Sequence, residues 1–128
     1  MRAEVREAIK NLRKAAKIIE KKGVFIRGHQ SYHGQHCALG AIGVAKGRGY
    51  AMQGDIEVEM LAKMLPTPQQ MPKDNYNSGS DDPKDWCARV ARWNNMVARN
   101  GKDVACRMRA AVEWALEKEK KHEAKSKD

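Results

Sequence analysis

The segment from His36 to Ala45 constrains the fold more than any other part of this 128-residue chain. From Cys37 onward it runs for nine residues without a charged side chain. A helix that is apolar nearly all round must be buried. Gly40, Gly43 and Gly47 fall on one helix face, although each glycine costs roughly 1 kcal/mol of helix propensity. We therefore predict a central buried helix, ending near residue 46, whose glycine face lies close to another part of the backbone.

Helical patterns flank this segment on both sides. The first predicted helix spans residues 2–22, with an apolar stripe at spacings of 4, 3, 4 and 3 residues, and Gly23 is its stop signal. The stripe consists of Val5, Ile9, Leu12, Ala16 and Ile19. Asp55 is the expected N-cap of a helix that ends before Pro66. The pattern thus places a helix on each side of the central one.

Two more helices are predicted in the second half of the chain. Asp82 followed by Pro83 is a typical start for a helix, and its apolar stripe contains Trp86, Val90, Trp93 and Val97. The two tryptophans of that stripe are expected to pack in the core. The last helix is expected to be capped by Asn100 and Asp103, with Val104, Met108, Ala111 and Ala115 on one apolar face.

The predicted architecture is a compact all-α single domain of about five helices over residues 1–116. Residues 66–82 are rich in Pro, Asn, Ser, Gly and Asp, which predicts a long loop leaving the helical body. From Glu117 onward no apolar stripe continues, so we expect the last helix to fray into a charged tail over residues 117–128.

Composition favours a soluble protein over a membrane or secreted one. The chain has 41% hydrophobic and 32% charged residues, and it contains no apolar run long enough to span a bilayer. The N-terminus lacks the apolar region of a signal peptide. Three irregularly spaced cysteines (Cys37, Cys87, Cys106) suggest reduced thiols. A cytoplasmic location is therefore expected.

The net charge of +9 is concentrated near the two ends of the chain. Within the first predicted helix, basic residues fall in a sector of about 120° by the helical period. These residues are Arg2, Arg6, Lys10, Arg13, Lys14, Lys17 and Lys21, and only Glu20 shares their sector. Such a ridge can track phosphates without reading sequence. A solvated helix face is the alternative interpretation.

Cys37 precedes the buried helix, so it is a candidate nucleophile. A thiolate at a helix N-terminus is stabilised by the macrodipole and by unpaired N–H groups. His33 and His36 are the nearest histidines, but His36 is adjacent in sequence and its side chain would usually point away. The base would therefore have to be His29 or His33 from the loop. The alternative is a small buried cysteine in the core, because a cysteine near a histidine is not diagnostic of catalysis.

The same segment could also be a metal site. His29, His33, His36 and Cys37 together would satisfy tetrahedral zinc. However, Cys87 and Cys106 have no neighbouring cysteine, and ligands confined to nine residues have little scaffold. We therefore predict no metal and no cofactor.

The order of these signals resembles a family of small actinobacterial and phage proteins of unknown function. The matching segments are Gly23-Val24, the Cys-x-x-Gly-Ala segment from Cys37 to Ala41, Trp93-Asn94-Asn95, and the helix start at Asp103-Val104. Val24 stands where the family has Trp, and Asn95 where it has Asp. The second change removes a carboxylate that a cysteine–acid pair would need. The resemblance implies a shared fold, and no activity comes with it.

These observations favour a non-enzymatic accessory binding protein of phage or bacterial type. It would engage a host protein or nucleic acid, and no membrane, through Arg6, Lys10, Arg13, Lys14, Lys17 and Lys21 together with the long loop. The competing hypothesis is a cysteine-dependent hydrolase or transferase that uses Cys37 with His33 or His36.

Overall fold

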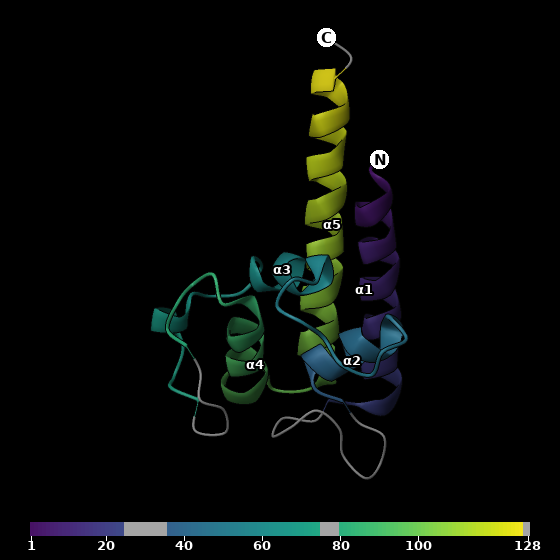
Figure 1. The fold of residues 1–128 in the computed structure, drawn as a ribbon. Helices are drawn as coiled ribbons and strands as arrows, with labels where there is room; N and C mark the ends of the chain where they lie inside the picture. Colours follow the sequence, from purple (N-terminus) through teal and green to yellow (C-terminus); the bar gives the residue numbers. More distant parts are fainter. Residues whose placement is uncertain (25–35, 75–79, 127–128) are drawn as a thin grey trace.

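Two long helices form the scaffold of the molecule. The computed structural model describes residues 1–24, 36–74 and 80–126. Helix α1 spans Ala3–Lys22 and helix α5 spans Gly101–Ser126. They pack side by side and antiparallel, and the C-terminal part of α5 extends past the start of α1 (Figure 1). The prediction of an all-α single domain is confirmed.

Small and medium apolar side chains fill the interface between α1 and α5. From α1 these are Ala8, Ile9, Leu12, Ala15, Ala16 and Ile19, and from α5 they are Val104, Ala105, Met108, Ala111, Val112 and Ala115. Gly101 starts α5 so close to α1 that an added Cβ would lie 3.1 Å from the Ile19 carbonyl oxygen. The predicted apolar stripes of both helices are therefore the core.

The predicted fraying of the last helix from Glu117 onward is wrong, because α5 continues to Ser126. Glu119 follows Val112 and Leu116 on the side of α5 that faces α1, and it is only 2% exposed. Its Oε1 accepts hydrogen bonds from Arg2 Nε and Nη2 at 2.9 and 2.6 Å. One turn later, Glu123 pairs with the Met1 ammonium at 2.6 Å. Beyond the apolar stripe, carboxylates of α5 thus hold this helix against the start of α1, where the helix dipole is positive.

Helix α2 spans Ala38–Ala45, as predicted, and all of its residues except Val44 are buried. It packs against α1, α3 and α4. The predicted close approach of a backbone occurs at Gly43, where an added Cβ would lie 2.2 Å from the backbone nitrogen of Tyr50. The chain returns to this position through Gly47 and Gly49, both at a φ of 80°. Glycine fits both positions because it adopts positive φ without strain.

Helix α3 spans Ile56–Ala62 and begins after Asp55, the predicted N-cap residue. Glu57 in its first turn is 1% exposed. Lys46 Nζ donates to both of its carboxylate oxygens at 2.8 and 2.9 Å, and Asn11 Nδ2 donates to Oε2 at 2.7 Å. This buried carboxylate therefore joins α1, the end of α2 and α3.

The start of the next helix differs from the prediction. Helix α4 spans Trp86–Met96, and its N-cap is Asp85, whose side chain accepts a hydrogen bond from the Ala88 N–H. Asp82 and Pro83 form the preceding turn instead, because Asp82 accepts hydrogen bonds from the Lys84 and Asp85 N–H groups. The predicted N-cap at Asp82 is therefore wrong by one turn.

The predicted tryptophan stripe of α4 is only partly core. Val90 and Trp93 are buried, whereas Trp86 is half-buried and Val97 is exposed. The predicted caps of α5 are confirmed, since Asn100 Oδ1 accepts from the Asp103 N–H and Asp103 Oδ2 accepts from the Arg99 N–H.

Arginines of α4 hold the described part of the 66–82 loop. The loop contains a 3-10 helix, η1, over Pro68–Gln70. Arg89 donates to the carbonyl oxygens of Leu65 and Pro66, and Arg92 donates to that of Pro72 and to the Asp81 carboxylate. The two flanks of the loop are thus fixed to the helical body.

Replacing Glu57 with alanine should destabilise the protein by about 2–4 kcal/mol, because Lys46 and Asn11 lose a buried charged partner. The measurement is the free energy of unfolding from urea titration. Glu59→Ala is the matched control, since Glu59 lies on the same helix and is 43% exposed. Its pair with Lys63 is long, at 3.9 Å, and therefore weak. Its effect should stay below roughly 0.5 kcal/mol. Equal effects of the two substitutions would contradict this role of Glu57.

Candidate functional site

A basic groove runs along α1 on the side where the helix meets Leu116 of α5. It has a volume of about 470 Å³. Its apolar lining residues are Met1, Ile9 and Leu116, and its other five lining residues are cations: Arg6, Lys10, Arg13, Lys14 and Lys17. The structure thus brings together five of the six predicted nucleic-acid-binding residues. Lys21 is exposed on the same helix but does not line the groove.

The cations of the basic groove carry unmatched charge. Within residues 1–24, 36–74 and 80–126, none of the five forms a hydrogen bond or ion pair with another side chain. Glu20, the one acid in their sector of the helix, pairs with Arg109 of α5 instead. The groove is therefore available to an anionic partner.

Arg2, the first residue of the predicted basic ridge, is not part of the groove. It pairs with Glu119, and the hydrogen bond and negative charge of that carboxylate raise the pKa of Arg2. The same hydrogen bond lowers the pKa of Glu119. Helical periodicity cannot separate Arg2 from the other basic residues, because the difference comes from a partner on another helix.

Cys37 is the N-cap residue of α2 and is only 6% exposed. Its Sγ accepts a hydrogen bond from the Gly40 N–H at 3.3 Å. Burial raises the pKa of the Cys37 thiol and outweighs this hydrogen bond. A nucleophilic cysteine needs the opposite, a lowered pKa and access to substrate. His36 is half-buried beside it and forms a single parallel backbone bridge with Val24.

The other histidines of the catalytic and zinc hypotheses, His29 and His33, lie outside the described residues. Among the residues that are described, no three His, Cys, Asp or Glu side chains are grouped in a way that could hold a metal ion.

Sequence reasoning did not predict the contact that joins two of the short motifs. Asn94 Oδ1 accepts a hydrogen bond from the Ala38 N–H at 3.0 Å, so it caps the first turn of α2 together with Cys37. Asn94 Nδ2 donates to Asn95 Oδ1, and Asn95 Nδ2 donates to Asp74 Oδ2. The Cys-x-x-Gly-Ala segment and the Trp-Asn-Asn segment therefore meet at the buried N-terminus of α2. Both segments could be recognised in the sequence, but only the fold shows that they touch.

The three thiols should label with iodoacetamide in the order of their exposure. Cys106 is exposed, Cys87 is half-buried and Cys37 is buried. Burial, together with the charges of Asp85 and Asp55, also raises the pKa of Cys87. We expect Cys106 to react first and Cys37 to react only when the protein unfolds, as followed by peptide mass spectrometry. Labelling of Cys37 before Cys106 in the native protein would favour the catalytic hypothesis.

Comparison with known proteins identifies a family. No curated protein and no solved structure gives a significant match. Within the described residues, no helix combines the length and the apolar character needed to cross a bilayer. A family described as of unknown function matches residues 3–113, from the start of α1 to the middle of α5. The chain belongs to this family of unknown function, DUF6197.

Proposed function

We propose that this protein is a non-enzymatic accessory protein of phage or bacterial type that binds nucleic acid through the basic groove of α1. One observation carries the proposal. Five cations line the groove, and no carboxylate among the described residues neutralises them. Of the three acids of α1, Glu20 pairs with Arg109, and Glu4 and Glu7 line other cavities.

The spacing of the cations suits a phosphate backbone. Arg6 and Lys17 are eleven residues apart on one helix, which corresponds to roughly 16 Å along the axis. That length is enough for contacts to about three phosphates of a duplex. Lys and Arg contacts of this kind add affinity by releasing counterions, and they carry no sequence information. The proposed binding is therefore independent of sequence.

The cytoplasm is the proposed location, and the actinobacterial or phage origin belongs to the same proposal. The odd number and irregular spacing of the cysteines, Cys37, Cys87 and Cys106, support a reducing compartment. An acidic host protein is the alternative partner for the same groove. The competing enzymatic function has less support, because Cys37 is buried and its pKa is raised.

Duplex binding should be weak, salt-dependent and sensitive to charge reversal in the groove. With about three phosphate contacts, affinity for a labelled 30-base-pair duplex should fall about 40-fold between 50 and 200 mM salt. The double substitution Lys10→Glu and Lys14→Glu should abolish most binding at 50 mM salt, because it removes two of the contacts and adds repulsion. Fluorescence anisotropy measures both effects.

The matched control is Lys102→Glu with Lys121→Glu, two exposed lysines of α5 outside the groove. Both double variants have the same net charge, so an equal loss of binding would contradict a specific role of the groove. Absence of duplex binding at 50 mM salt would refute the nucleic-acid proposal. Binding of poly-glutamate alone, lost in the groove variant, would point to an acidic protein partner.

A further inference from the structure

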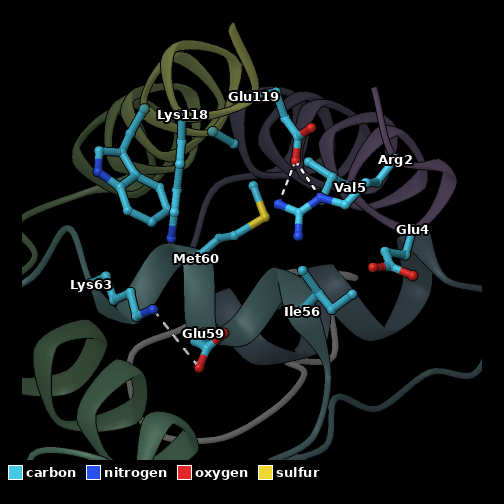
Figure 2. A pocket seen from close by; sticks show the side chains of 11 residues that line it. Arg2, Glu4, Val5, Ile56, Glu59, Met60, Lys63, Lys118 and Glu119 are labelled. Carbon is cyan, nitrogen blue, oxygen red and sulfur yellow. Dashed lines mark hydrogen bonds and ion pairs between the residues drawn. The ribbon is translucent and has the colours of Figure 1, made fainter. Parts of the chain in front are cut away.

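A second cavity lies between the start of α1, helix α3 and the C-terminal half of α5. Its volume is about 220 Å³. It lies on a different face of α1 from the basic groove, because Arg2, Glu4 and Val5 line it from that helix. Figure 2 shows that its side chains come from all three helices. We call it the interhelical cavity.

The interhelical cavity has a mixed lining. Its apolar residues are Val5, Ile56, Met60, Trp114 and Ala115, and its charged residues are Arg2, Lys63, Lys118, Glu4, Glu59 and Glu119. Ile56 is 36% exposed, so part of the apolar lining faces solvent. A cavity of about 150 Å³ holds benzene in another protein. The interhelical cavity is therefore large enough for an aromatic ring with a short chain.

Arg2 offers an unused donor to the cavity. Its Nε and Nη2 both donate to a single oxygen of Glu119, Oε1. Its third nitrogen, Nη1, has no hydrogen-bond partner among the described residues, and Figure 2 shows it directed into the space between Met60 and Ile56. A guanidinium held in this way can still donate to a second carboxylate.

Lys118 supplies a second cation from the α5 side. Its Nζ lies 4.8 Å from the centroid of the Trp114 ring, and it forms no ion pair with a described residue. Lys63, by contrast, lies over both Trp86 and Trp114 and pairs with Glu59 at 3.9 Å. Glu4 and Glu59 line the same cavity. Arg2 Nη1 and Lys118 Nζ, the donors without an ionic partner among the described residues, therefore line the cavity together with its apolar residues (Figure 2).

We infer that the interhelical cavity binds a small monocarboxylate with an apolar tail. The carboxylate would lie between Arg2 and Lys118, close to the N-terminus of α1, whose dipole favours an anion. The tail would pack on Met60, Ile56 and the Trp114 ring. This site is separate from the basic groove and does not depend on nucleic-acid binding.

Three probes of similar shape and different charge test the inference. They are phenylacetate, 2-phenylethanol and 2-phenylethylamine, titrated into the full chain while ¹H–¹⁵N spectra are recorded. The Trp114 indole signal is identified by its loss in Trp114→Phe. Phenylacetate should shift this signal at millimolar concentration, 2-phenylethanol should bind more weakly, and the amine should bind least. No shift with phenylacetate, or tighter binding of the amine, would overturn the inference.

A matched pair of lysine variants tests the carboxylate contact. Lys118→Gln should weaken phenylacetate binding roughly 5- to 10-fold and leave 2-phenylethanol binding unchanged, because only the anion uses the ammonium group. Lys121→Gln changes the same charge on an exposed position of α5 outside the cavity. It should leave both affinities unchanged. An equal loss in the two variants, or a loss for the alcohol as well, would overturn the assignment of the carboxylate to Lys118.

Discussion

The close antiparallel packing of α1 on α5 is the constraint on which the rest of the structure depends. Alanines and Gly101 keep the two helices near each other along the shared interface. Charged pairs hold it at both ends, with Glu119 and Glu123 at the start of α1 and Arg109 on Glu20 near its end. Helices α2 and α3 pack on this pair, and α4 packs on α2 and α3. Both candidate sites are lined by residues of α1 and α5, and α3 also lines the interhelical cavity.

Buried polar groups then fix how the short helices sit on that pair. Glu57 connects three helices through Lys46 and Asn11. Asn94 connects α4 to the first turn of α2, where Cys37 also accepts a backbone N–H. The Glu57 and Asn94 side chains are both hydrogen-bonded, as buried polar groups generally are. The most reactive-looking residues of the sequence are thus explained first as caps of a buried helix.

Most of the fold followed from apolar periodicity, and the exceptions have physical causes. The stripes of α1 and α5 and the uncharged run of α2 predicted buried helices that the structure contains. The continuation of α5 was not predictable from hydropathy, because Glu119 is buried through a partner that is 117 residues away in the sequence. The start of α4 was misplaced because two aspartates three residues apart both have the chemistry of an N-cap, and local sequence does not rank them.

The basic groove could be predicted from one helix alone, since periodicity brings its five cations together. The interhelical cavity could not, because its residues come from three separate segments. The backbone contact at Gly43 was predicted, but its partner was not. That partner has a consequence for how related chains can vary. Because the nearest atoms are main-chain atoms of Tyr50, no change of side chain at residue 50 can make room for a larger residue at position 43. A relative without glycine there should have an insertion or deletion between α2 and α3, so the length of that turn and the identity of residue 43 should change together.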